Sequence, residues 1–256
     1  LAASTPSLLS SKAKSLSFTT SGCNPSDFRT NLLKAIDRGL PENLALAALT
    51  TNPAKICGIE KFAGTLEKDK LANLFITGGK NVFSRDSLIH STWIRGAPHL
   101  FRPDLKLKDS NKSHETKSEA KPIARFPAIE RKPIASPKSV LFKKFKLWTC
   151  EAEGILTGHD LLVRNGKIIA IGMGLEESVP SGCKIIEGKG KHLTPGIIDC
   201  HSHAMILGGV NESTLPSTSM VRIADVVNSE SMNIEWQLAG GVTSCNLLHG
   251  SANPIG

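Results

Sequence analysis

The sequence lacks long apolar runs and a dense set of cysteines, and it has few aromatic residues. No apolar run approaches the roughly 20 residues of a membrane-spanning helix, which excludes a membrane span. The six cysteines, at positions 23, 57, 150, 183, 200 and 245, are scattered without a CxxC pair, which favours free thiols over a disulfide framework. Aromatic residues make up 5% of the chain and tyrosine is absent.

The positive charge of the chain is confined to one stretch. Residues 102–146 contain 13 Lys or Arg against 5 Asp or Glu, which equals the whole net charge of +8. The same stretch holds five prolines and almost no periodic apolar pattern, so we expect a basic Pro/Ser/Lys-rich linker over 104–138. A nucleic-acid-binding arm is the alternative, because a basic stripe is its electrostatic footprint. Its aromatic interleaving is poor, which favours a solvated linker.

The most informative segment is PGIIDCHSH, at 195–203. Side chains alternate across a strand, so His201 and His203 are expected to point to the same side. Two imidazoles held side by side form half of a site for a divalent metal. A bare HxH at a strand end is usually incidental, but here an apolar strand and a preceding Pro-Gly turn favour the metal interpretation.

Three further residues are candidates for the same site. Asp199 either orients a metal ligand or bonds backbone amides at the strand end, and both remain open. His249 and Asn253 follow the apolar run 242–247, in a loop that is expected to lie beside the histidine pair. They either contact substrate or hold the loop through bonds to its own backbone.

The spacing of apolar residues predicts that most of the chain forms helices and strands joined by turns. The expected helices are 26–39, 42–50, 52–58 and 229–239. The expected strands are 71–77, 87–94, 139–149, 160–163, 167–171, 184–187, 196–201 and 242–247. Strand, helix and strand over 196–247 predict a βαβ unit with parallel pairing.

Two segments resemble the amidohydrolase superfamily, in its imidazolonepropionase-like and dipeptidase-like branch. LTPGIIDCHSH is similar to the first barrel strand of that family, and GGVTSCNLLHGSANPIG is similar to the second-strand segment. A third, ENLALAALTTNPAKICGIEKFAGTLEKDKLANLFITGG at 42–79, is similar to the closing segment of such an enzyme. The closing segment therefore precedes the opening one. We interpret the chain as the junction of a tandem protein, truncated at both ends.

The resemblance implies an α/β fold made of pieces of metal-dependent hydrolase (β/α)8 barrels, incomplete here, with an accompanying small β-sandwich. Five parts are expected: the end of a first barrel, its returning sandwich strands, the linker, the sandwich strands of a second unit and the first two strands of a second barrel. Their boundaries are 1–70, 71–103, 104–138, 139–192 and 193–256.

The function implied by the resemblance is metal-dependent hydrolysis of a carbon–nitrogen bond by metal-bound hydroxide, in a small amide, cyclic amide or dipeptide. His201 and His203 would bind one or two divalent ions, with zinc favoured, and the remaining ligands and the catalytic aspartate would follow Gly256. No catalytic residue is assigned within the chain, and the fragment alone is expected to be inactive.

The first unit departs from the family pattern. Where the family commonly has an aspartate at the end of the last barrel strand, the matching position is near Ser21. Serine cannot take a proton from water at neutral pH as a carboxylate can, so the first unit is expected to be degenerate. This keeps open the alternative of a non-catalytic amidohydrolase-fold scaffold. A homo-oligomer and either a cytoplasmic or a periplasmic location also stay open.

Overall fold

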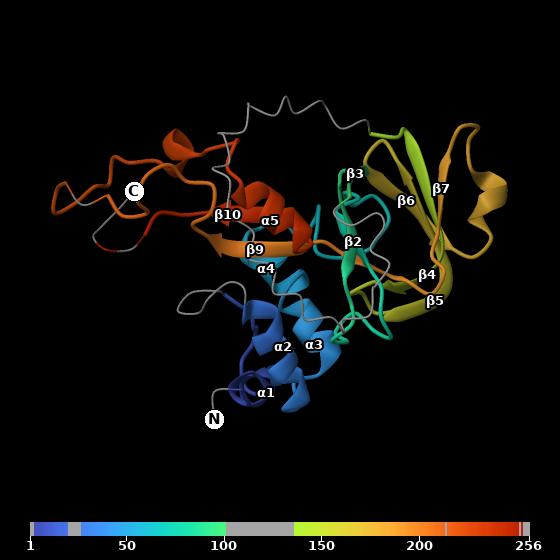
Figure 1. The fold of residues 1–256 in the computed structure, drawn as a ribbon, viewed down its shortest axis with the longest axis horizontal. Coiled ribbons are helices and arrows are strands. Elements are labelled where there is room, and N and C mark those ends of the chain that lie inside the picture. Colours follow the sequence, from blue (N-terminus) through green and yellow to red (C-terminus); the bar gives the residue numbers. More distant parts are fainter. Residues whose placement is uncertain (1–2, 20–26, 101–135, 213, 251, 253–256) are drawn as a thin grey trace, which may run out of the picture.

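The computed structural model describes residues 3–19, 27–100, 136–212, 214–250 and 252 (Figure 1). Most of the expected linker 104–138 and the candidate residues Ser21 and Asn253 lie outside these residues. The helices are α1 (Thr5–Ser10), α2 (Phe28–Asp37), α3 (Glu42–Ala47), α4 (Thr51–Ile56) and α5 (Asn233–Ala239), with 3-10 turns η2 (Leu175–Ser178) and η3 (Ile223–Val226). Among the described helices, none combines the length and apolar character needed to cross a membrane.

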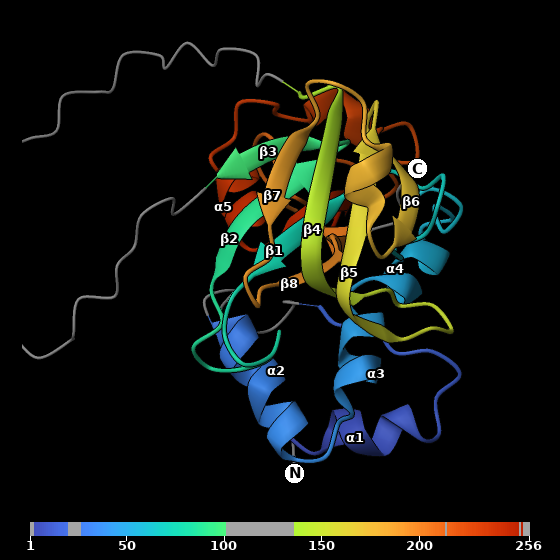
Figure 2. The ribbon, with the colours of Figure 1, turned by 90° about the vertical axis from the view of Figure 1, so that its right-hand side faces the viewer.

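Most strands belong to one curved sheet, seen broadside in Figure 2. Its strands are β1 (Leu74–Thr77), β2 (Ile89–Ile94), β3 (Ala97–Leu100), β4 (Ser139–Trp148), β5 (Ile155–Arg164), β6 (Lys167–Gly172), β7 (Lys184–Glu187) and β8 (His192–Pro195). The order is β3-β2-β1-β8-β4-β5-β6, and β7 pairs with β4. Strands from the two sides of the expected linker therefore lie in one sheet, although they were expected in two separate units.

The long strand β4 pairs with two different strands along one edge. Its first half pairs in parallel with β7 and its second half with β8. Between them Lys144 has a φ of 54°, and the carboxylate of buried Asp160 accepts its N–H at 2.9 Å. The chain crosses this bend at Gly188, where any side chain would overlap the backbone of Lys144. Glycine at this position lets β7 and β8 follow one another along β4.

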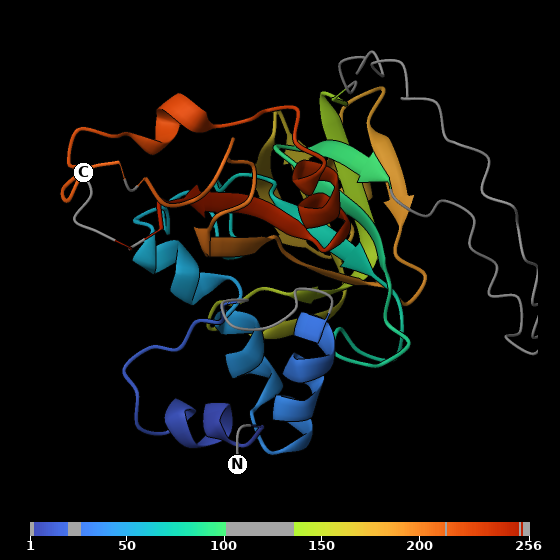
Figure 3. The same cartoon turned by 60° about the vertical axis from the view of Figure 1, so that its left-hand side comes forward.

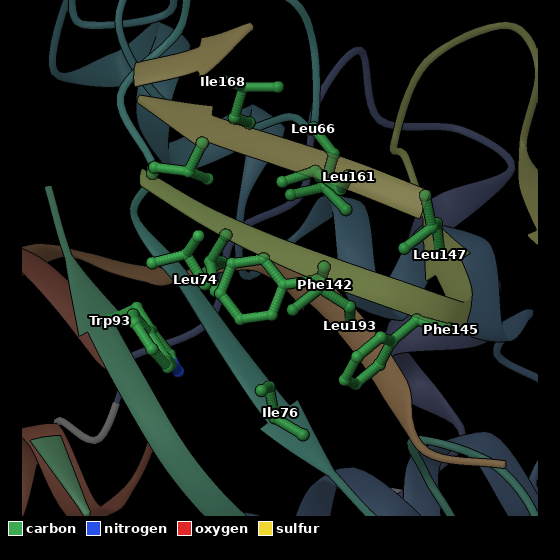
Figure 4. Close-up of a cluster of buried hydrophobic side chains, with 13 residues drawn as sticks. Leu66, Leu74, Ile76, Trp93, Phe142, Phe145, Leu147, Leu161, Ile168 and Leu193 are labelled. Atoms are coloured by element: carbon green, nitrogen blue, oxygen red, sulfur yellow. The ribbon is translucent and has the colours of Figure 1, made fainter. Parts of the chain in front are cut away.

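The main core lies against this sheet and is drawn in Figure 4. Its buried residues before position 101 are Leu66, Ala72, Leu74, Ile76 and Trp93, and those after position 135 are Val140, Phe142, Phe145, Leu147, Leu161, Val163, Ile168 and Leu193. The Trp93 and Phe142 rings meet edge to face, with centroids 4.9 Å apart. Side chains from before position 101 and from after position 135 thus fill one core.

A second core joins the helical region to the sheet. Helices α2 and α3 contribute Leu32, Ala35 and Leu46, which share a buried cluster with Phe75 of β1 and Trp148 of β4. Helices α1, α2 and α3, in blue, lie below the sheet in the views of Figures 1 and 3. The amphipathic spacing of this region, which predicted helices, is therefore explained by burial against the sheet.

The remaining unit is strand β9 (Ile197–Ser202), helix α5 and strand β10 (Val242–Leu247). The two strands pair in parallel, which confirms the predicted βαβ unit. Within the described residues these strands form a separate two-stranded sheet, and no closed barrel is present. The fold is a mixed α/β fold that is richer in strands than expected.

Local predictions were accurate where the turn chemistry was strong. The bounds of β7 and β10 are those expected, and the turns Arg95-Gly96 and Asn165-Gly166 have positive φ at both residues. The expected helix 229–239 begins at Asn233. Strand β8 was missed, because its Pro195 was interpreted as part of a turn.

Candidate functional site

The histidine pair converges as the alternation of a strand requires. His201 lies near the end of β9 and His203 directly after it. Their Nε2 atoms are 3.3 Å apart, and the rings are nearly perpendicular, with centroids separated by 5.0 Å. Both side chains are exposed. The strand therefore presents two imidazole nitrogens to one point at its carboxyl end.

The tautomer of His203 is set by the end of the neighbouring strand. Its Nδ1 lies 2.8 Å from the carbonyl oxygen of Leu248, which can only accept, so Nδ1 carries the proton. The Nε2 of a neutral His203 then keeps its lone pair. The N–H of Leu248 in turn donates to the oxygen of Ser202 at 3.0 Å. In metal sites, a hydrogen bond from the second ring nitrogen to a carbonyl oxygen fixes the orientation of a metal-binding histidine, and the bond of His203 to Leu248 is of this kind.

The spacing of the two nitrogens fits a shared divalent ion. Two ligands bound at about 2.0–2.1 Å in tetrahedral geometry lie roughly 3.3–3.4 Å from each other. The observed separation of 3.3 Å between the Nε2 atoms of His201 and His203 agrees with this value. Two imidazoles suit zinc and other borderline divalent metals. Within the described residues no third His, Cys, Asp or Glu completes a metal-binding group, so any ion held by this pair needs further ligands from elsewhere.

Asp199 bonds the backbone of its own strand. Its Oδ1 accepts the backbone N–H of His201 at 3.3 Å. Two roles were expected for Asp199, and this contact corresponds to the bond with a backbone amide. It holds the strand end that carries the imidazoles.

His249 lies in the loop after β10, next to Leu248. Its Nε2 is shielded from solvent, and no described residue forms a hydrogen bond with it. The following residue, Gly250, donates its N–H to the oxygen of Val210 at 2.6 Å, which ties this loop to the segment after β9. A buried imidazole nitrogen without a partner is costly, so His249 stays a candidate for contact with a ligand. Asn253, predicted beside it, lies outside the described residues.

The cysteines near the site are free, as expected, and protonated. Cys245 of β10 pairs in register with Asp199, and burial together with that carboxylate raises the pKa of the thiol to about 12. Burial and Asp199 also raise the pKa of Cys200, and burial with the neighbouring charges of Cys200 and Asp199 raises that of Cys57. Because the thiolate is the effective nucleophile, the raised pKa values make these three cysteines poor nucleophiles.

Strand β9 rests on residues that sequence reasoning did not assign to the site. The N–H of Ile198 donates to the oxygen of Leu49 at 2.9 Å, and its side chain packs with Ala54 of α4 and with Ala63. Backbone carbonyls such as those of Leu49 and Leu248 leave no signature in a sequence. The apolar character of Ile198 was the single available signal that β9 has a buried side.

Comparison with known proteins gives partial matches. No protein-family model matches the chain. It is 40% identical over 80 residues to an imidazolonepropionase of Klebsiella pneumoniae, covering 29% of this chain and 19% of that protein. It is 37% identical over 106 residues to amidohydrolase tasK of Hapsidospora irregularis, covering 38% of this chain and 11% of that protein.

One further curated relative and one solved structure are similar to part of the chain. A dihydroorotase of Halalkalibacterium halodurans is 40% identical over 63 residues, covering 25% of this chain and 14% of that protein. A solved amidohydrolase of Thermotoga maritima is 36% identical over 45% of this chain and 31% of that one, with a TM-score of 0.41. The chain spans less than a fifth of the length of the curated relatives named here. These sequence matches support a relationship of the matched segments to the amidohydrolase superfamily.

Proposed function

We propose that this chain is part of a metal-dependent amidohydrolase that hydrolyses a carbon–nitrogen bond in a small amide or cyclic amide. The observation that carries the proposal is the convergence of His201 and His203, with Nε2 atoms 3.3 Å apart on the strand that resembles the family's first barrel strand. The sequence similarity to amidohydrolases supports the reaction class. We further propose that the site holds one or two divalent ions and that the metal is zinc.

The described residues would have different roles in this reaction. His201 and His203 would hold the ion through ring nitrogens, and the Leu248 carbonyl keeps the His203 proton on Nδ1, so that Nε2 would be free to face the ion. A divalent metal held there would supply Lewis acidity, polarising the substrate carbonyl and lowering the pKa of water towards neutrality. Asp199 holds the strand end through the backbone of His201. We also propose that the buried Nε2 of His249, which has no hydrogen-bond partner among the described residues, bonds a polar group of the substrate.

The chain order supports a tandem protein. The family's closing segment, at 42–79, comes before its opening strand at 195–203. The match to amidohydrolase tasK covers 38% of this chain but 11% of that protein, which is therefore more than three times as long. A protein of that length has room for two such units. We propose that the described residues span the junction between them.

The test uses the whole protein with His201→Ala and His203→Ala, and His159→Ala as the matched control. His159 is a histidine on β5 of the sheet, whose Nδ1 lies 3.0 Å from the oxygen of Thr157. We expect each site variant to lose most bound metal and at least about 100-fold in turnover, because the ion is left short of a ligand. The control should keep both. Metal-free wild-type protein without amidase activity would instead support a scaffold.

A further inference from the structure

The loop after β10 is held at two points. Leu248 donates its N–H to the oxygen of Ser202 at 3.0 Å, and the oxygen of Leu248 accepts the Nδ1 proton of His203 at 2.8 Å. Two residues later, the N–H of Gly250 donates to the oxygen of Val210 at 2.6 Å. Consecutive Cα atoms are a fixed distance apart, so a shift of Gly250 is passed on to the Leu248 carbonyl. The contact of His203 therefore depends on where Gly250 lies.

Val210 follows a paired stretch of the chain. Ile206 and Val227 form an antiparallel β-bridge, and the N–H of Leu207 donates to the oxygen of Val226 at 2.8 Å. Leu207 is three residues before Val210 in the sequence. The loop after β10 is therefore bonded to a segment that has backbone hydrogen bonds of its own.

Gly250 lies against this segment too closely for any side chain. It is buried, and a Cβ atom at this position would overlap the side-chain oxygen of Asn211 and lie 3.2 Å from a methyl carbon of Val210. Its φ is outside the left-handed region, so space rather than backbone conformation requires the glycine. Gly209, directly before Val210, is different, because a Cβ atom there would have nothing within 4 Å apart from its chain neighbours. The close approach is therefore particular to Gly250.

We propose that Val210 and Asn211 are positioning residues for the histidine pair. They hold Gly250 in place, and Gly250 keeps the Leu248 carbonyl beside the Nδ1 proton of His203. The Nε2 atom of the same ring then keeps its lone pair on the side of the other imidazole, and the ring is oriented before an ion binds. The effect on a metal rests on the proposed function, whereas the positioning of the ring does not.

The size of the effect follows from the bond at the second ring nitrogen. Loss of such a bond weakens metal binding by a histidine roughly 10–100-fold. A methyl group added at Gly250 must displace the Asn211 amide and press on Val210, and the Leu248 carbonyl moves with the loop. Because the substitution acts on the bond only through the backbone, we expect an effect at the lower end, about 10-fold.

The first test measures the zinc affinity of the whole protein by competition with a chromophoric chelator. Gly250→Ala should raise the dissociation constant for zinc about 10-fold. Gly209→Ala is the matched control, since it makes the same change in open space and should bind zinc as the wild type does. Gly250→Ala combined with Asn211→Ala removes the overlapping amide and should regain most of the affinity. A general loss of stability would not be reversed by a second substitution. Unchanged affinity in Gly250→Ala, in a protein that binds zinc, would overturn the proposal.

Crystal structures of the metal-free variants give a measurement that does not depend on zinc. In Gly250→Ala the distance from the Nδ1 of His203 to the oxygen of Leu248 should rise from 2.8 Å to beyond about 3.5 Å, and it should return in the double variant. A contact that stays intact in Gly250→Ala, or that the double variant does not restore, would overturn the proposal. If the contact changes as expected but the wild type binds no zinc, the positioning stands and the proposed function fails. An unchanged contact in a zinc-binding protein would do the opposite.

Discussion

The sheet of strands β1 to β8 with its core, here called the β domain, can be compared with the βαβ unit of β9, α5 and β10. The two differ in how completely their strands are paired and their large apolar side chains are buried. In the β domain the long strands have partners, and its core includes Trp93 and Phe142, each at most 2% exposed. In the βαβ unit the paired strands form a two-stranded sheet, and Trp236 of α5 is 68% exposed. Stability therefore resides in the first region and the candidate chemistry in the second. Such a division is usual, because functional residues lie where a rigid scaffold holds them at its edge.

The largest effect should come from breaking the core of the β domain. Phe142→Ala removes a fully buried ring that contacts Trp93 and Phe145, and we expect a loss of about 3–5 kcal/mol in the free energy of unfolding. Trp236→Ala is the matched change in the other region and should alter it by less than about 0.5 kcal/mol. Urea unfolding measures both. Equal losses would contradict the contrast between the two regions.

A bulky residue between the regions should move the histidine strand. Ala54 of α4 is 1% exposed and packs against Ile198, so Ala54→Phe overfills the contact and should reduce stability by about 1–3 kcal/mol. Because β9 must shift, bound metal in the whole protein should also fall. Lys55→Phe, on an exposed position of the same helix, is the control. Unchanged metal content in Ala54→Phe would show that α4 does not position the site.

Acid should weaken the β domain through His192. This buried imidazole accepts the indole N–H of Trp148 at 3.0 Å, and burial lowers its pKa below the usual 6.5. The folded state therefore binds the proton less readily than the unfolded state. The stabilisation is complete above pH 6.5 and declines as the pH falls below that value, until both states are protonated. Unfolding midpoints measured from pH 8 to 5 should drop less in His192→Gln.

The smallest effect concerns the thiols of the two regions. Burial with the charge of Asp199 raises the pKa of Cys245 to about 12, and burial raises that of Cys150 to about 11. Neither should react with a thiol reagent at pH 7.5 until the protein unfolds, since the thiolate is the reactive form. Labelling followed by peptide mass spectrometry identifies the modified cysteines. Rapid labelling of Cys245 in the folded protein would show that β10 is open to solvent.

Local structure could be predicted from the sequence, whereas the long-range assembly could not. The strand alternation of DCHSH was enough to place His201 and His203 on one side, and turn residues gave the bounds of β7. The pairing of β1 with β8 joins residues more than a hundred positions apart, and no local pattern encodes it. The Leu248 carbonyl was equally hidden, because every residue has one.

The central claim is that His201 and His203 share a divalent metal, and anomalous diffraction from crystals of the whole protein tests it most directly. Data collected on both sides of the zinc absorption edge give a map in which zinc alone produces a strong difference. We expect a peak within about 2.0–2.1 Å of the Nε2 atoms of both histidines. A zinc-loaded, active protein whose peak lies away from both atoms would contradict the account.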